Sequence, residues 1–103
     1  MVKMEEQKTN IKIRQVLDLQ PPRDYKVIYI NDNETTFEFV HGSLINIFDY
    51  DDQPATDKVA EINEKGSGIV AILPFEIAEQ KGVEVLMLAR TRGYPLEVRL
   101  EQG

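Results

Sequence analysis

The stretch KVIYINDNETTFEFV, residues 26–40, decides how this chain folds. Residues 26–30 are mostly β-branched or aromatic, which predicts a β-strand. The Asn-Asp-Asn run at 31–33 then ends the strand, because Asn and Asp hydrogen-bond to their own backbone in turns. Residues 35–38 match a capping box, in which Thr35 would cap a helix and Glu38 would reach back to it. A strand is therefore predicted to pass into a helix through a polar turn.

Hydrophobic spacing predicts three helices in all. The first follows the capping box and ends near residues 49–51. The second begins near Asp52, with a proline in its first turn where proline is tolerated, and stops at Gly66, a residue type that commonly ends helices. The third begins at Pro74. It contains Gly82, which costs about 1 kcal/mol relative to Ala inside a helix, and we attribute this glycine to close packing.

Two further strands complete the predicted architecture. Residues 69–73 are apolar on both faces and are expected at the centre of the sheet, whereas residues 96–100 alternate and should have one face in water. The order β-α-α-β-α-β predicts an α+β sandwich, with a three-stranded antiparallel sheet packed by three helices. We expect one core domain at 23–103. Residues 1–22 are polar and mixed in charge, and are expected to be a mobile N-terminal extension or a partner-binding segment.

Composition excludes several classes of function. The chain has 103 residues, a formal net charge of -6 and a pI near 4.7, which argues against binding to nucleic acid or anionic membranes. It has no cysteine, so disulfides and thiolate chemistry are impossible. No apolar run approaches the ~20 residues of a membrane span, and the N-terminus lacks an apolar signal core. We therefore expect a cytoplasmic protein, and a monomer.

The candidate catalytic groups all have simpler structural explanations. His41 is the single histidine, follows the apolar position Val40, and is expected on the surface rather than as a catalytic base. One histidine without cysteine offers no zinc site. Gly66-Ser67-Gly68 lacks the frame of a phosphate-binding loop. We expect no enzymatic activity, no metal site and no cofactor.

The polar cluster at residues 31–35 leaves two interpretations open. It can be a simple turn and helix cap. Alternatively, the oxygens of Asn31 and Asp32 can accept hydrogen bonds from an ammonium group, which has three donors and no acceptor. Phe37 and Val40 would then form an apolar wall beside them. Such a site would hold an α-amine attached to a hydrophobic side chain.

An ordered set of short motifs resembles the ClpS family, the adaptors of the ATP-dependent Clp protease. The resemblance extends from about Pro21 to Glu101 and includes, in chain order, PPR-x-YKVI at 21–28, ND at 31–32, EFV at 38–40, AT at 55–56, Gly66, FE-x-AE-x-K at 75–81, LAR at 88–90 and PL at 95–96. Members of this family have the same order of elements, in a fold similar to the C-terminal domain of the ribosomal stalk protein.

The resemblance implies an adaptor that binds N-degrons, which are proteins beginning with Leu, Phe, Tyr or Trp, and delivers them to a Clp AAA+ unfoldase, usually ClpA. Three sets of residues carry the implied roles. The α-amine would be held by Asn31, Asp32, Asn63 and Thr35. The side-chain pocket would be lined by Phe37, Val40, Val59, Ile62 and Leu96. The surface that docks on the unfoldase N-domain would include Glu76 and Lys81, and the N-terminal extension would serve during handover.

The chain departs from the family pattern at four positions in or beside this site. Asn63 stands where the family usually has a His, and Asn33 stands where it has a second Asp. Phe37 and Val59 replace residues that are commonly Met. These changes predict weaker affinity or an altered set of accepted first residues. Two alternatives stay open: a docking-only regulator of the unfoldase that has lost N-degron binding, and a stalk-like interaction domain with no link to a protease.

Overall fold

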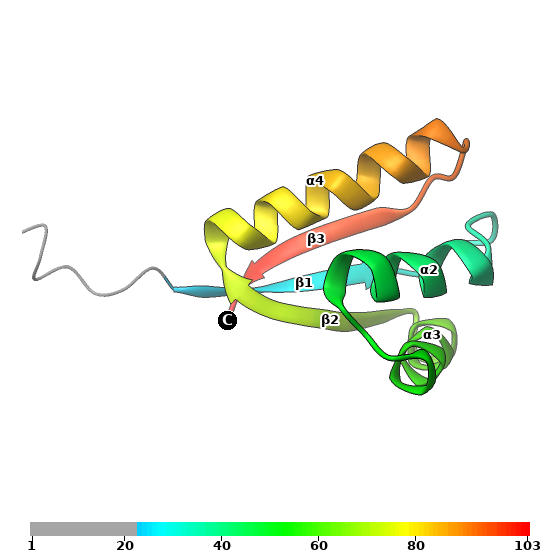
Figure 1. Cartoon of the computed structure of the whole chain (residues 1–103), viewed down its shortest axis with the longest axis horizontal. Helices are drawn as coiled ribbons and strands as arrows, with labels where there is room; N and C mark the ends of the chain where they lie inside the picture. Colours follow the sequence, from blue (N-terminus) through cyan, green and yellow to red (C-terminus); the bar gives the residue numbers. More distant parts are fainter. Residues whose placement is uncertain (1–22) are drawn as a thin grey trace, which may run out of the picture.

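The structure, a computed structural model, describes residues 23–103. The predicted order of elements and the α+β class are confirmed (Figure 1). The predicted extension, residues 1–22, lies outside the described residues. The elements in chain order are β1 (Asp24–Ile30), α2 (Phe37–Phe48), α3 (Asp52–Lys65), β2 (Ser67–Pro74), α4 (Phe75–Thr91) and β3 (Glu97–Gln102).

The three strands form an antiparallel sheet in the order β2-β1-β3. The prediction that residues 69–73 lie at its centre is wrong, because β1 is the central strand and β2 forms an edge. Three consecutive residues of β1, from Val27 to Tyr29, are buried, and β1 has a hydrogen-bonded strand on each side. The apolar residues that suggested a central β2 include Ile69 and Ile72, which are 39% and 55% exposed. Apolar composition on both faces of β2 therefore did not mean burial on both faces.

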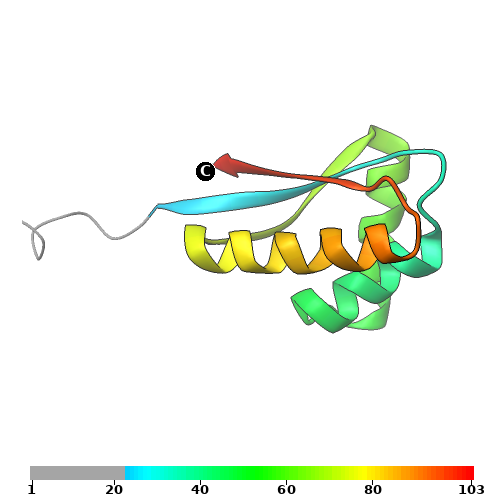
Figure 2. The ribbon, with the colours of Figure 1, turned by 90° about the horizontal axis from the view of Figure 1, so that it is seen from above.

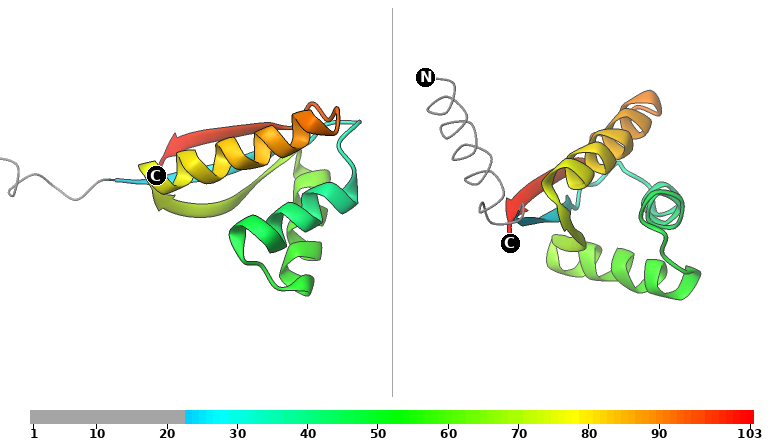
Figure 3. Two further views of the ribbon diagram at one scale, coloured as in Figure 1. Left: turned by 45° about the horizontal axis from the view of Figure 1, so that its top comes forward. Right: turned by 60° about the vertical axis from the view of Figure 1, so that its left-hand side comes forward.

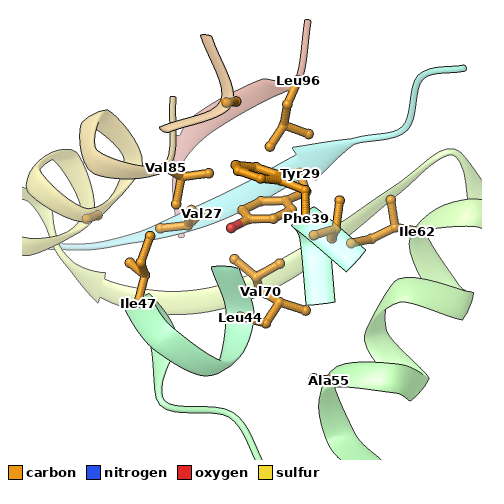
Figure 4. Packing of buried hydrophobic residues seen from close by; sticks show 13 residues of the cluster. Val27, Tyr29, Phe39, Leu44, Ile47, Ala55, Ile62, Val70, Val85 and Leu96 are labelled. Carbon is orange, nitrogen blue, oxygen red and sulfur yellow. The ribbon is translucent and has the colours of Figure 1, made fainter. Parts of the chain in front are cut away.

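The helices and the sheet enclose one core. Helices α2 and α4 lie on the same side of the sheet (Figure 2), and α3 packs against α2 and β2. Tyr29 is fully buried inside the core (Figure 4). Its hydroxyl lies 2.8 Å from that of Ser43, which itself donates to the Val40 carbonyl at 2.8 Å, so Tyr29 is the donor to Ser43. Burial raises the pKa of Tyr29 well above its ordinary value, and its hydroxyl stays protonated.

Glycine has a specific purpose at two positions near the start of β2. Gly66 ends α3 with φ of 88°, a left-handed conformation that glycine adopts without a steric penalty. Gly68 lies so close to α3 that a Cβ there would be 2.8 Å from Ile62 Cγ1. At Gly82 a Cβ would be 3.8 Å from Val98 Cγ1, an ordinary contact. Close packing therefore accounts for Gly68 and does not account for Gly82.

The helices were also compared with the length and hydropathy that a membrane span requires. Within residues 23–103, no helix combines the length and the apolar character that crossing a bilayer requires.

Candidate functional site

A cavity of about 340 Å³ opens where β1 ends, α2 begins and one face of α3 passes. These three segments lie at the end of the molecule opposite the C-terminus (Figure 1), where α3 packs across α2 (Figure 3). The polar residues that line the cavity are Asn31, Asp32, Thr35, Thr36, Thr56 and Asn63. The apolar residues that line it are Phe37, Val40, Val59, Ala60 and Ile62.

The carboxylate of Asp32 orders the loop at the mouth of the cavity. Its Oδ1 accepts hydrogen bonds from the backbone N–H groups of Glu34 at 2.8 Å and Thr35 at 2.7 Å. Its Oδ2 accepts from the Thr35 hydroxyl at 2.7 Å. Desolvation raises the pKa of Asp32, but the hydrogen bonds from Thr35 and Glu34 outweigh that effect and hold the pKa below its usual value. Asp32 is therefore a carboxylate at neutral pH and supplies negative charge at the mouth.

The start of α2 differs from the predicted capping box. The N-cap is Thr36, whose hydroxyl oxygen accepts from the Phe39 N–H at 3.1 Å. Thr35 was predicted as the cap, but its N–H and hydroxyl both donate to Asp32. The loop that Asp32 orders therefore includes Thr35, and the helix begins one residue later than predicted. Both threonines line the cavity.

Two asparagines join the end of β1 to the end of α3. The Asn31 N–H donates to the Gly66 carbonyl at 2.9 Å, which fixes the end of the strand beside the end of the helix. Asn31 Nδ2 then lies 3.5 Å from Asn63 Oδ1, at the long limit of a hydrogen bond. Residues that are distant in the sequence thus share one rim of the cavity, next to Asp32.

The apolar part of the cavity has a buried floor and an exposed wall. Val40 and Ile62 belong to the core and are 8% and 4% exposed, so they form a floor that cannot move freely. Phe37 is 49% exposed and forms a wall at the first turn of α2. Its ring stacks on His41, with centroids 5.2 Å apart and planes 18° apart. The His41 side chain is 19% exposed, so it lies at the surface but is more enclosed than expected.

The structure brings most of the predicted binding residues together, but not all. All four residues predicted for the α-amine line the cavity, as do four of the five predicted for the side-chain pocket. The exception is Leu96, which is 2% exposed, belongs to the core and does not line the cavity.

The two predicted docking residues lie on α4, away from the cavity. Glu76 is exposed in the first turn of that helix. Lys81 is half-buried, and its Nζ donates to the Ile47 carbonyl at 2.7 Å and lies 5.8 Å from the centre of the Phe48 ring. Lys81 therefore also holds the C-terminal end of α2 against α4.

Sequence reasoning missed three residues that line the cavity, Thr36, Thr56 and Ala60. Thr56, Ala60 and Asn63 are spaced at i, i+4 and i+7, so they share one face of α3. This spacing was present in the sequence and indicated the full width of the helix face. The role of Thr36 was hidden because the capping-box pattern assigned the cap to its neighbour.

The arrangement suits a cation attached to an apolar group. Oxygens of the polar rim can accept hydrogen bonds, and the ionised Asp32 favours a positive charge there. Phe37, Val40 and Ile62 offer apolar surface only a short distance away. In the part of the chain that the structure describes, no three His, Cys, Asp or Glu residues are grouped so that they could hold a metal ion.

Comparison with known proteins identifies the family of this chain. The profile of the family described as "ATP-dependent Clp protease adaptor protein ClpS" matches residues 20–99. A ClpS adapter from Shewanella loihica is 40% identical over 94 residues, covering 91% of this chain and 92% of that protein. One from Campylobacter jejuni subsp. jejuni is 39% identical over 84 residues, covering 82% and 88%.

A solved structure of Agrobacterium tumefaciens ClpS2 bound to L-phenylalaninamide superimposes with a TM-score of 0.77. That protein is 30% identical, and the match covers 80% of this chain and 99% of the other. The fold, the family profile and the curated relatives therefore agree, and the chain belongs to the ClpS family of Clp protease adaptor proteins.

Proposed function

We propose that this protein is an adaptor that binds N-degrons in the cavity between β1, α2 and α3. The proposal rests on one observation: a single cavity of about 340 Å³ has a polar rim with the ionised Asp32 and an apolar floor. Asp32, Asn31, Asn63 and Thr35 hold the positively charged α-amine of the first residue. Phe37, Val40, Val59 and Ile62 surround its side chain. The adaptor binds its cargo and performs no reaction on it.

The ligand of the Agrobacterium relative supports this choice of cargo. L-phenylalaninamide, the molecule bound in that structure, has a free α-amine and a benzyl side chain. It therefore carries the two chemical features that the rim and the floor of this cavity match. A protein beginning with Phe, Tyr, Trp or Leu presents the same pair of features at its N-terminus.

The second step of the proposal is delivery to a Clp AAA+ unfoldase through its N-domain, as for a ClpA-type partner. Glu76 and Lys81 would contribute to docking from α4. The start of α4 lies at the opposite end of the molecule from the loop that follows β1 (Figure 1), so cargo and unfoldase can be bound together. The described chain also begins at this end, where Gly103 N–H donates to the Asp24 carbonyl. In this proposal residues 1–22 serve in handover, beside the docked partner. We further propose that the adaptor is a monomer in the cytoplasm.

One observation supports a second candidate function, a docking-only regulator of the unfoldase. Both oxygens of Asp32 already accept hydrogen bonds from the loop, three in total. These three hydrogen bonds give the carboxylate a structural role that requires no cargo, and Asn63 supplies no titratable partner. Under this second function Asp32→Asn would not affect any binding to the unfoldase, and the cavity would hold no N-terminus.

The experiment that separates the two functions is fluorescence anisotropy with labelled peptides that begin with Phe, Leu, Tyr, Trp and Gly. An N-acetylated Phe peptide is the control, because it keeps the side chain and loses the charge. The adaptor function predicts micromolar or tighter binding of the bulky set and a loss of roughly 10- to 100-fold on acetylation, as expected for hydrogen bonds to a charged group. Equal binding of all peptides, or none, would refute it.

Docking is tested separately with Glu76→Lys, which reverses the charge of an exposed side chain. We expect this variant to bind peptides normally and to lose affinity for the purified N-domain of the unfoldase. Lys81 is the poorer probe, because its substitution also removes the hydrogen bond to Ile47. Unchanged N-domain binding by Glu76→Lys would exclude Glu76 from the docking surface.

A further inference from the structure

The exposed wall of the cavity, Phe37, is supported by the ring of His41, whereas the floor is held by the core. Phe37 is the first residue of α2 and is 49% exposed, so core packing does not restrain its ring. His41 lies one helical turn further along the same face, since residues four apart are neighbours on a helix. The two rings are stacked, 5.2 Å apart and within 18° of parallel.

His41 is in turn held from a different helix. Its Nε2 lies 3.0 Å from Oδ1 of Asp52, the first residue of α3. The His41 side chain is 19% exposed and that of Asp52 is 83% exposed, so the imidazole is the enclosed partner. His41 itself does not line the cavity. It therefore supports Phe37 from the side of the ring that the cargo does not reach.

We propose that His41 is a positioning residue that fixes the Phe37 ring and thereby makes the cavity prefer aromatic over aliphatic first residues. The inference rests on the proposed binding of N-degrons. His41, Phe37 and Asp52 form a chain of contacts that links the mouth of the cavity to the start of α3. His41 touches no cargo in this arrangement and acts only through Phe37.

The physical reason is that aromatic and aliphatic contacts depend differently on ring orientation. Two aromatic rings attract most strongly in offset-stacked or edge-to-face arrangements, which require a defined orientation of both rings. The contact between a ring and Leu depends mainly on the apolar area buried. A fixed Phe37 ring therefore favours Phe, Tyr and Trp, whereas a freely rotating ring has to be ordered each time cargo binds.

The test compares the affinities of Phe-initiated and Leu-initiated peptides for His41→Ala and the wild type. We expect His41→Ala to weaken Phe peptides by roughly 2- to 10-fold, the cost of ordering one side chain on binding, and to change Leu peptides by less than about twofold. His41→Phe keeps a ring for stacking and should retain the wild-type ratio. Asn46→Ala, an exposed change on the same helix, is the matched control and should alter neither affinity.

Wild-type selectivity in His41→Ala would overturn the proposal, as would equal losses for both peptides. NMR of the assigned Phe37 ring in the free protein provides an independent measurement, and we expect faster ring flipping in His41→Ala than in His41→Phe. A wild type that binds no peptide but shows this difference would refute the proposed function and the selectivity, while leaving the positioning contact intact. Equal ring flipping in all variants would refute the positioning contact itself.

Discussion

Asn31 and Asn63 meet across the rim of the cavity, with Nδ2 of the first 3.5 Å from Oδ1 of the second. The contact joins the end of the central strand to the last turn of α3. Because neither amide titrates, this part of the rim keeps the same charge at every pH near neutrality.

Asn63→His should make peptide binding depend on pH between about 5 and 7.5. An unperturbed histidine titrates near pH 6.5 and, once protonated, repels the α-ammonium of the cargo. We expect the ratio of variant to wild-type affinity for a Phe peptide to fall several-fold as the pH is lowered through this range. Using the ratio removes any effect of His41, which both proteins share.

Asn63→Gln is the matched control for this experiment, because it changes shape without adding a titratable group. Its affinity ratio to the wild type should be constant across the same range. A constant ratio for Asn63→His as well would show that residue 63 does not face the bound amine.

Asp32 should stabilise the fold at neutral pH and lose this effect in acid. Its pKa in the folded protein lies below the ordinary value of 3.8, so its contribution is fully present above that value and disappears as the pH falls through the lower, folded pKa. We expect Asp32→Asn to lower the free energy of unfolding by about 1 kcal/mol at pH 7, since hydrogen bonds in this partly solvated loop are lost.

The measurement is urea denaturation of both proteins at several pH values from 7 to 2.5. The difference between them should be constant from pH 7 to about 5 and should shrink toward zero at the acid end. A difference that grew on acidification would contradict the direction of the pKa shift.

Gly68→Ala should destabilise the protein and disturb the cavity together. The new methyl group would lie 2.8 Å from Ile62 Cγ1 and 3.2 Å from Glu61 Oε2, so α3 has to shift away from β2. Overpacking of this kind costs about 1–3 kcal/mol. Because Ile62 is part of the cavity floor, peptide affinity should fall too. Thermal denaturation measures the loss of stability, and fluorescence anisotropy measures the loss of affinity.

Gly82→Ala should have the opposite effect on stability. Gly82 is buried on α4, but a Cβ there meets Val98 and Leu100 at 3.8 and 4.0 Å, which is ordinary contact. The substitution should stabilise the fold by about 0.4–1 kcal/mol through reduced freedom of the unfolded chain. It is also the control for Gly68→Ala, since peptide affinity should not change. A lower melting temperature for Gly82→Ala would contradict the available space.

The local sequence was sufficient to predict the order of elements. Helical spacing located the three helices, and β-branched and aromatic composition, an apolar run and strict alternation located the three strands in turn, because these patterns depend on residues close together in the chain. Pro54 and Gly66 correctly indicated where α3 begins and ends, since their backbone preferences act within one turn. Most of the cavity residues were also identified, through the ordered motifs shared with the ClpS family.

Local patterns failed where a neighbouring side chain competes for the same groups or where another element decides the packing. Thr35 matched a capping motif, yet Asp32 takes both of its donors, so Thr36 caps α2. The apolar run at 69–73 suggested a central strand, but strand order depends on the packing of the whole sheet. The contact between His41 and Asp52 had no local signal, because Asp52 belongs to another helix.

The amino-acid sequence by itself therefore determined the fold class, the element order, the family and most of the polar and apolar residues of the cavity. Only the tertiary structure decided that β1 is central, that Leu96 belongs to the core rather than to the cavity lining, and that Lys81 holds the end of α2. The physical reason is range. Backbone propensities and side-chain periodicity act over a few neighbouring residues, whereas burial and side-chain pairing depend on which distant segments the folded chain brings together.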